Sequence, residues 1–206
     1  MAVPEPALAI AGDPAPAPPV VVALVCSAGG LEALRCILGA LPREFPGAVL
    51  VLQHQAPLRR SYLVDVLGRS SGLPVRQARS GDRLTAGTVL VVPPGRHAVV
   101  TAANTVALVA SNQTPPYRPS ADLLLTSLAL TAAERTIAVV LSGFGHDAAT
   151  GASVLHACGG TVIASDEASS EHFEMPRASI EREDAVDHVL PVEDIAPMLV
   201  KLAAAR

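Results

Sequence analysis

Aromatic residues are scarce in this chain of 206 residues, which contains three Phe, two Tyr and no Trp. Stacking platforms for the bases of single-stranded nucleic acid are therefore missing. The formal charge is −4 at pH 7 and no run rich in Lys or Arg occurs, which argues against a nucleic-acid partner and against an anionic membrane surface. We expect an aliphatic core and no nucleic-acid binding.

Long apolar runs and a regular cysteine pattern are also missing. No apolar run reaches the roughly 18 residues that a membrane-spanning helix needs, and the N-terminus lacks a basic region followed by an apolar one. Cys26, Cys36 and Cys158 are odd in number and widely spaced, which indicates reduced thiols and gives no zinc-ligand spacing. We therefore expect a soluble, cytoplasmic protein with no membrane insertion and no metal site.

Apolar residues make up 50% of the chain, which is enough for one domain to bury a core without covalent staples. Residues 1–18 are rich in Pro and Ala and are predicted to form a disordered tail, so the folded domain is expected at 19–206. Buried strands are predicted at 20–25, 48–53, 136–141, 161–164 and 186–190. Helices are predicted at 31–41, 61–69, 120–133, 148–158 and 193–204, with a helical turn from Met175 and with Ser61 and Ser120 as N-caps. This alternation predicts an α/β fold, with a doubly wound and mostly parallel sheet and helices on both faces.

The segment 73–111 has a different texture from the rest of the domain. Its Val-rich stretches are short, and turns rich in Gly, Pro and Asn separate them where a helix would be expected between parallel strands. These stretches lie at 75–78, 88–92, 97–100 and 105–109. This pattern is typical of antiparallel strands, so we expect a small antiparallel β insert at an edge of the sheet.

Three predicted strand ends carry residues that could act together: Ser27, His54 and Asp147. Parallel strands end at one edge of a sheet, so residues from separate strands can converge there. A serine hydroxyl needs a histidine to take its proton, and the histidine needs a carboxylate to fix its tautomer and stabilise its charged form. The residues alone do not separate a Ser-His-Asp triad from a chance combination, because a chain of this length offers many such triples.

Each of these residues also has a simpler interpretation. Ser27 lies in a Gly-rich turn before a helix, where a hydroxyl often serves as a cap or a phosphate ligand, although the dinucleotide fingerprint is missing. His54 could be a structural histidine, and Asp147 could cap the helix that follows it. His146 is the alternative base and Ser142 the weaker alternative nucleophile. The remaining histidines are expected to be structural or exposed: His97, His156, His172 and His188.

Five motifs carry a resemblance that covers nearly everything from Val20 onward. They are CSAGGLEAL around Ser27, VLQH ending at His54, RPSADLLLTS from Arg118, LSGFGHDAATG from Leu141 and EMPRASIE from Glu174. In their order and spacing they resemble the catalytic domain of the chemotaxis protein-glutamate methylesterases. The resemblance implies a serine esterase that hydrolyses methyl esters on receptor glutamates, and that in many members also deamidates receptor glutamines, without a cofactor.

The resemblance also implies a role for each site residue. Ser27 would be the nucleophile, His54 the general base and then acid, and Asp147 the orienting carboxylate. Backbone N–H groups near Ala28 and Phe144 would receive the charge that develops on the carbonyl oxygen. Support or substrate contact is implied for residues in loops near the site: Arg118, Ser120, Asp122 and Met175. The implied partner is the cytoplasmic domain of a methylated chemoreceptor, with a receptor methyltransferase or a separate response regulator as further candidates.

Several positions depart from the residues usual in that family. They are Cys26 for Ala or Ser, Gln55 for Met, Phe144 for Met, Ala148 for Gly, and Glu174 for Gly. None removes a triad member. Phe144 and Glu174 would nevertheless place a ring and an extra carboxylate near the mouth of the site, where they would affect substrate fit.

Regulation is expected to differ from that of the family. Its usual N-terminal phosphoacceptor receiver domain has no counterpart in residues 1–18, so we expect no activation by phosphorylation in cis. Two other functions stay open on the sequence. One is a non-catalytic module that binds receptors or a methyltransferase, and the other is a phosphate-binding enzyme that uses the turn at 27–30.

Overall fold

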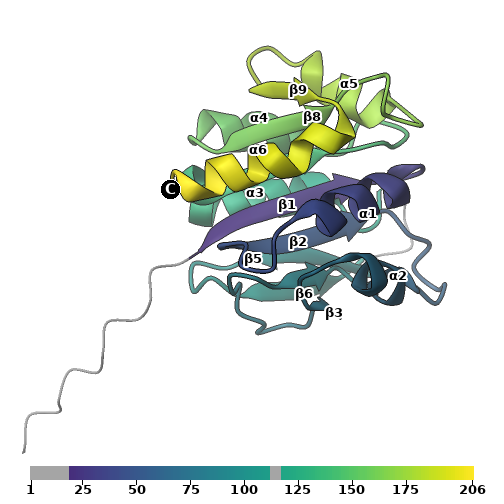
Figure 1. The fold of residues 1–206 in the computed structure, drawn as a ribbon. Coiled ribbons are helices and arrows are strands. Elements are labelled where there is room, and N and C mark those ends of the chain that lie inside the picture. Colours follow the sequence, from purple (N-terminus) through teal and green to yellow (C-terminus); the bar gives the residue numbers. More distant parts are fainter. Residues whose placement is uncertain (1–18, 112–116) are drawn as a thin grey trace, which may run out of the picture.

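The computed structural model describes residues 19–111 and 117–206 (Figure 1), so the predicted tail at 1–18 lies outside the described residues. Seven strands form one sheet in the order β3-β4-β2-β1-β7-β8-β9, and every neighbouring pair is parallel. The strands are β1 (Val20–Cys26), β2 (Gly47–Gln53), β3 (Val75–Gln77), β4 (Val89–Val91), β7 (Thr136–Val140), β8 (Thr161–Ser165) and β9 (His188–Leu190). The predicted doubly wound α/β fold is confirmed. The strand order reverses between β1 and β7, and in such sheets ligands bind at the carboxyl ends of the strands beside this point.

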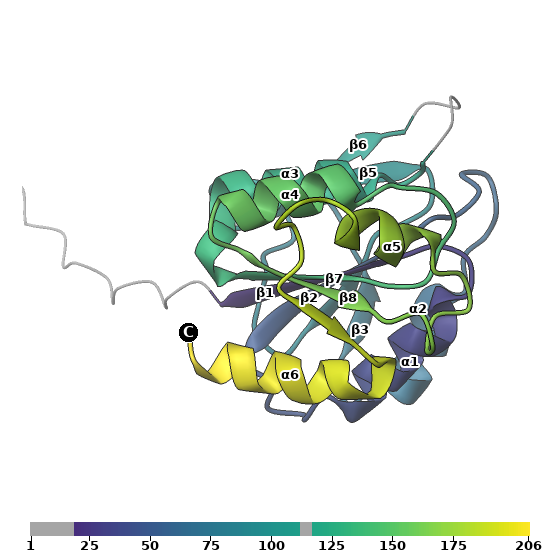
Figure 2. The ribbon, with the colours of Figure 1, turned by 90° about the horizontal axis from the view of Figure 1, so that it is seen from above.

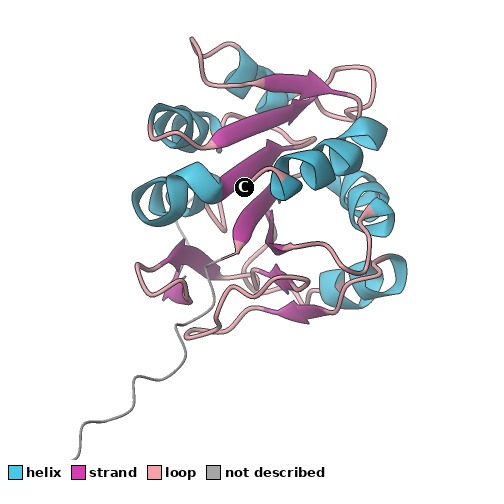
Figure 3. Ribbon diagram, turned by 60° about the vertical axis from the view of Figure 1, so that its left-hand side comes forward, coloured by secondary structure: helices cyan, strands magenta, loops and turns pink. Residues whose placement is uncertain are grey.

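Helices cover both faces of the sheet, as Figures 2 and 3 show. They are α1 (Gly30–Ala40), α2 (Leu63–Ser70), α3 (Ala121–Ala132), α4 (Ala149–Ala157), α5 (Glu174–Ile180) and α6 (Val192–Ala204), with a 3-10 turn, η1 (Ala133–Arg135). Side chains of β1 alternate between the two faces, because successive residues of a strand point in opposite directions. Val22 and Leu24 belong to the core that includes residues of α1, α2 and α6, whereas Val21, Ala23 and Val25 belong to the core under α3 and α4. Strand β1 is thus buried on both faces.

Of the two predicted N-caps, Ser120 and Ser61, only Ser120 caps a helix. The Ser120 hydroxyl accepts a hydrogen bond from the N–H of Leu123 at 3.3 Å, so Ser120 is the N-cap of α3, as predicted. The Ser61 hydroxyl accepts from the N–H of Leu63 at 3.3 Å, but the N-cap of α2 is Tyr62. Helix α2 therefore begins two residues later than predicted.

The prediction of four antiparallel pieces at 73–111 is wrong for the first two. The pieces at 75–78 and 88–92 become β3 and β4 of the parallel sheet, and only β5 (Arg96–Val100) and β6 (Val106–Ala110) form an antiparallel pair. The connection between β3 and β4 pairs with β6 instead of forming a crossover helix, since the N–H of Gly81 donates to Val106 at 2.8 Å.

The hairpin of β5 and β6 packs beside α3 (Figure 2). The N–H of Val100 donates to the Ser127 hydroxyl of that helix at 2.9 Å, so the hairpin covers a face of the sheet rather than extending its edge. No helix among the described residues is long and apolar enough to cross a membrane.

Candidate active site

The ends of β1, β2 and β7 bring three segments of the chain together at one edge of the sheet. Cys26 pairs with Gln53 in the parallel register of β1 and β2, so Ser27 and His54 are the next residues on two adjacent strands. The N–H of His54 donates to the carbonyl oxygen of Cys26 at 3.0 Å, and the N–H of Ser27 donates to that of Ser142, just after β7, at 2.9 Å. Ser27 and His54 therefore leave the sheet side by side.

Asp147 binds the His54 imidazole from the loop that follows β7. Its Oδ2 lies 2.8 Å from Nε2 of His54, and the exposed fractions of the two side chains are 1% for Asp147 and 11% for His54. The same carboxylate accepts hydrogen bonds from the N–H groups of Ala121 at 2.6 Å and Asp122 at 2.9 Å, and from the hydroxyl of Ser120 at 3.2 Å. It thus lies at the N-terminus of α3, where unpaired N–H groups and the helix dipole favour a negative charge.

The simpler interpretation of Asp147, as the cap of the helix that follows it, is wrong. The N-cap of α4 is Ala148, which has no side-chain acceptor, and the carboxylate that binds the first turn of α4 is Asp122, through the N–H of Gly151 at 2.7 Å. Ala148 has a φ of 84°, a left-handed conformation that turns the chain between Asp147 and α4. The carboxylate is then available to the first turn of α3, a helix that precedes it in the chain.

Hydrogen bonding keeps Asp147 ionised in spite of its burial. Burial alone would raise the pKa of this carboxyl, but the hydrogen bond from His54 and those from the N–H groups of Asp122 and Ala121 outweigh it, so the pKa lies below its usual value. Asp147 therefore carries a full negative charge next to the imidazole at neutral pH.

Ser27 and His54 each keep one group without a partner. Neither the Ser27 hydroxyl nor Nδ1 of His54 forms a hydrogen bond with any described residue, whereas Nε2 of His54 is bonded to Asp147. A hydroxyl is a donor and an unprotonated ring nitrogen is an acceptor. The two free groups are therefore chemically complementary.

A tyrosine that sequence reasoning missed packs on the His54 ring. The rings of Tyr117 and His54 are stacked, with centroids 5.3 Å apart and an interplanar angle of 23°. The Tyr117 hydroxyl accepts from the N–H of His146 at 3.1 Å and lies 3.2 Å from Nδ1 of the same residue. The alternative base His146 is thus bonded to Tyr117, and the only sequence signal for Tyr117 was its place one residue before the RPSAD motif.

The glycine-rich loop after β7 packs directly against Ser27. A Cβ atom added to Gly143 would lie 2.7 Å from Cβ of Ser27 and 3.0 Å from Cγ of Met175, so only glycine fits. The N–H of Gly143 is bonded to the carbonyl of His172 at 2.8 Å. By contrast, the N–H groups of Ala28 and Phe144 form no hydrogen bond with a described residue, which leaves two donors on the segments that flank Ser27.

Ser142, the alternative nucleophile, has a hydroxyl that is fully used inside the structure. The hydroxyl donates to the carbonyl of Ala28 at 2.8 Å and accepts from the N–H of His172 at 2.9 Å. Its exposed fraction is 2%. Ser142 therefore links β7 to the turn after β1.

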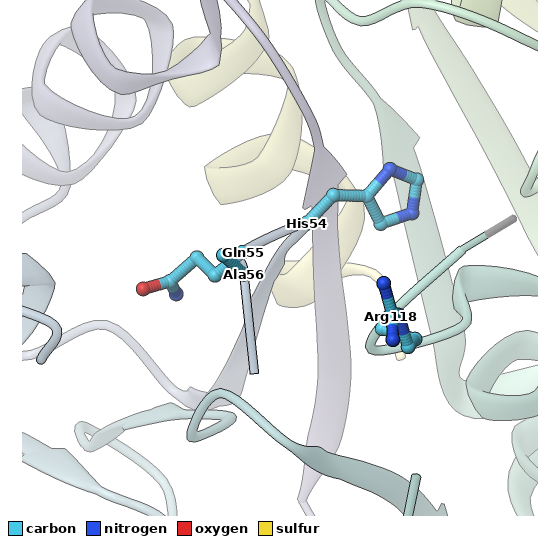
Figure 4. Close-up of a pocket in the computed structure, with 4 residues that line it drawn as sticks. All are labelled: His54, Gln55, Ala56 and Arg118. Carbon is cyan, nitrogen blue, oxygen red and sulfur yellow. The ribbon is translucent and has the colours of Figure 1, made fainter. Parts of the chain in front are cut away.

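The remaining predicted site residues surround the site. His54, Gln55, Ala56 and Arg118 line a hollow of about 260 Å³ (Figure 4). Asp122 faces α4, where it accepts from the N–H of Gly151 at 2.7 Å. Burial raises the pKa of Asp122, and the charge of Asp147 raises it further. Met175 is fully buried.

The two unusual residues at the mouth of the site have defined positions. Oε2 of Glu174 accepts from the N–H of Gly145 at 2.9 Å, so this carboxylate supports the glycine-rich loop. Phe144 has an exposed fraction of 50%, and its ring centroid lies 4.0 Å from that of His172. No group of three or more His, Cys, Asp or Glu that could hold a metal ion occurs in the described part of the chain.

Comparison with known proteins identifies the family to which this arrangement belongs. A family model described as CheB methylesterase matches residues 22–199. The chain belongs to this family. It is 38% identical to protein-glutamate methylesterase/protein-glutamine glutaminase 3 of Paramagnetospirillum magneticum, over 90% of this chain and 52% of that protein. It is 42% identical to protein-glutamate methylesterase/protein-glutamine glutaminase 2 of Anaeromyxobacter dehalogenans, over 88% and 53%.

A solved structure has the same fold as this chain. The crystal structure of the Thermotoga maritima CheB methylesterase catalytic domain matches with a TM-score of 0.84 and 34% identity, over 89% of this chain and 98% of that one. The chain thus corresponds to a whole CheB catalytic domain, whereas it covers only 52% and 53% of the two curated relatives.

Proposed function

We propose that this chain is a serine esterase that hydrolyses glutamate methyl esters in the cytoplasmic domain of a chemoreceptor. One observation carries the proposal: His54 is bonded through Nε2 to the buried carboxylate of Asp147, on the strand end next to Ser27. The curated relatives are named for this activity, and the enzyme and its substrate would meet in the cytoplasm.

The first half of the reaction forms an acyl-enzyme. Because Asp147 accepts a hydrogen bond from Nε2, the neutral His54 ring holds its proton there, and Nδ1 is free to take the proton of Ser27. The Ser27 oxygen attacks the carbonyl carbon of the ester. Negative charge then develops on the carbonyl oxygen, and the free N–H groups of Ala28 and Phe144, with the N-terminus of α1, would stabilise it. His54 returns its proton to the methoxy oxygen, and methanol leaves.

The second half of the reaction releases the product. Water attacks the acyl carbon while His54 takes a proton from it, and the proton then passes to the departing Ser27 oxygen. The products are a glutamate carboxylate and the original serine. Asp147 stays ionised throughout and stabilises the positive charge on His54 in both steps.

Replacement of the proposed nucleophile tests this mechanism. Ser27→Ala should lower methanol release from methyl-esterified receptor fragments by about 10⁴-fold or more, with an unchanged circular dichroism spectrum. Ser153→Ala, which removes a hydroxyl from α4, is the matched control and should keep full activity. Near-normal turnover by Ser27→Ala would exclude the mechanism, and saturable binding of the fragments by the wild-type chain without hydrolysis would favour a binding module.

The same residues could deamidate glutamine, an activity that the names of the relatives include. Attack on the amide gives the same acyl-enzyme, and His54 would protonate the nitrogen so that ammonia leaves. Ammonia release from receptor fragments that carry glutamine measures this activity, and Ser27→Ala should abolish it together with methanol release.

A further inference from the structure

Four hollows follow the carboxyl edge of the sheet from His54 toward the β5–β6 hairpin. Each shares a lining residue with the next. The first, at His54, shares Gln55 with a hollow of about 200 Å³ that also contains Ser61. Ser61 also lines a hollow of about 230 Å³, which shares Gln77 and Pro93 with the last one. The last has a volume of about 440 Å³. The four hollows are therefore neighbours in a row that begins at the proposed general base, and we call this row the depression.

Arginines line this depression. Arg118 lines the first hollow, Arg60 the second, and Arg79 and Arg96 the last. We call Arg60, Arg79 and Arg96 the arginine track; all three are exposed. None of them forms an ion pair with a described residue.

The acidic groups near the arginine track neutralise it only in part: Asp82 is close enough to Arg79 for the charge of that arginine to help lower the pKa of its carboxyl. Asp82 accepts from the N–H of Arg79 but is ion-paired with Arg76 at 2.5 Å. The guanidinium of Arg60 lies 5.2 Å from the ring centroid of Tyr62. Asp65 is the one acidic residue that lines the four hollows in the described part of the chain. The depression is therefore basic, although the chain as a whole carries a formal charge of −4.

The opposite side of the site carries the opposite charge. The chain that follows β8, up to and including the first residue of α5, contains Asp166, Glu167, Glu171 and Glu174. A segment with several carboxylates would be repelled from this side and attracted to the arginine track. A protein substrate that places one side chain at Ser27 must lie across the surrounding surface, and this charge difference gives it one preferred direction.

We infer that the arginine track docks an acidic segment of the protein substrate, running from the esterified glutamate at Ser27 toward Arg79 and Arg96. This inference rests on the proposed function, because that function supplies a protein substrate. Carboxylates of the segment would pair with guanidinium groups, which bind carboxylates through two parallel hydrogen bonds. The site would thereby select glutamate esters that lie in acidic surroundings.

Binding without turnover tests the inference directly. Two fluorescent peptides of about 20 residues each carry one glutamate γ-methyl ester. In the acidic peptide the ester is flanked by Glu residues, and in the neutral peptide it is flanked by Gln residues. Fluorescence anisotropy measures their affinities for the Ser27→Ala chain. At low salt the acidic peptide should bind about 10-fold more tightly than the neutral one, and 0.5 M salt should remove most of the difference because exposed charges are screened (Debye length below about 8 Å).

Two double variants in the same background locate the effect. Arg79→Gln with Arg96→Gln should remove the preference for the acidic peptide. Arg43→Gln with Arg69→Gln, which deletes the same charge from exposed positions outside the four hollows, should keep it. Equal affinities for the two peptides, or equal losses in the two double variants, would overturn the inference.

The outcome is independent of the catalytic proposal. If the wild-type chain releases no methanol but the acidic peptide is preferred through Arg79 and Arg96, the docking surface stands and the esterase proposal fails. If methanol is released equally from both peptides and neither variant changes KM, the esterase proposal stands and the docking surface fails.

Discussion

At the scale of single residues, the Asp147 carboxylate connects the proposed chemistry to the fold. It accepts hydrogen bonds from four donors: His54, Ala121, Asp122 and Ser120. A carboxylate offers about four lone-pair sites, so its acceptor capacity is filled. The same group therefore orients the imidazole and completes the N-terminus of α3, and a change in it should affect both activity and stability.

Asp147→Asn should lower kcat by about 10⁴-fold and destabilise the fold by about 3 kcal/mol. The amide has one acceptor oxygen, so its NH₂ group must face donors that the carboxylate now satisfies. Methanol release and urea unfolding measure the two effects. Asp187→Asn is the matched control. Asp187 lies outside the site, where its Oδ2 is 3.4 Å from Nδ1 of His156, so this variant should keep the wild-type kcat. A variant with normal kcat would contradict the orienting role.

The pKa of Asp147 predicts a specific dependence of stability on pH. Its value in the folded state is lowered, whereas an Asp in the unfolded chain has a pKa of about 3.9. The folded state then binds fewer protons, so this group stabilises the fold above about pH 4 and loses its contribution as the pH falls through the folded-state value. The difference in free energy of unfolding between wild type and Asp147→Asn should therefore be smaller at pH 3 than at pH 7. A constant difference over that range would contradict the prediction.

At the scale of elements, the site depends on loops that hold one another. Tyr117, just before α3, stacks on His54 after β2 and is bonded to His146 after β7. The loop after β7 is also held by Glu174 of α5 through the N–H of Gly145. The imidazole is thus fixed on one side by a carboxylate and on its face by a ring.

Two replacements of Tyr117 separate the stacked ring from the hydroxyl. Tyr117→Phe keeps the ring and loses the bonds to His146, so kcat should fall by less than about 10-fold. Tyr117→Leu removes the ring, and kcat should fall by up to about 100-fold, since small misplacements of a reacting group are costly. KM should change less than kcat. The NMR resonances of the His54 ring protons should move further from their wild-type positions in the Leu variant than in the Phe variant. Equal kcat values for the two variants would exclude a positioning role for the ring.

The sequence predicted elements well where the signal is local and poorly where partners are distant. The buried strands before Ser27 and His54 can be predicted because each is a continuous apolar run. Their residues can also be predicted to lie close together, because parallel strands end at one edge of a sheet. The contact of Tyr117 with His54 joins residues 63 positions apart, and no local pattern encodes it. Strands β3 and β4 were assigned to the wrong kind of pairing because no helical period marks the crossover between them.

At the scale of the whole molecule, the site draws on nearly the full length of the domain. Ser27, His54, Tyr117, Asp147 and Met175 lie in five separate segments, and the two cores on either side of the sheet fix their relative positions. Strand β1 contributes to both cores and ends at Cys26, directly before Ser27. The proposed catalytic geometry therefore forms only in the folded domain.

A cavity in β1 should reduce stability without changing the chemistry of the folded molecules. Leu24 is fully buried, and Leu24→Ala should lower the free energy of unfolding by about 3 kcal/mol, which corresponds to a decrease in Tm of roughly 6–12 °C for a domain of this size. At 25 °C the folded fraction should stay high and kcat should stay near the wild-type value, because Leu24 lies in the core that includes residues of α1, α2 and α6. The activity should then be lost in parallel with the cooperative unfolding measured by circular dichroism. Loss of kcat at temperatures well below that transition would mean that the cavity distorts the edge of the sheet at Ser27, so that packing inside β1 sets the position of the proposed nucleophile as well as the stability of the fold.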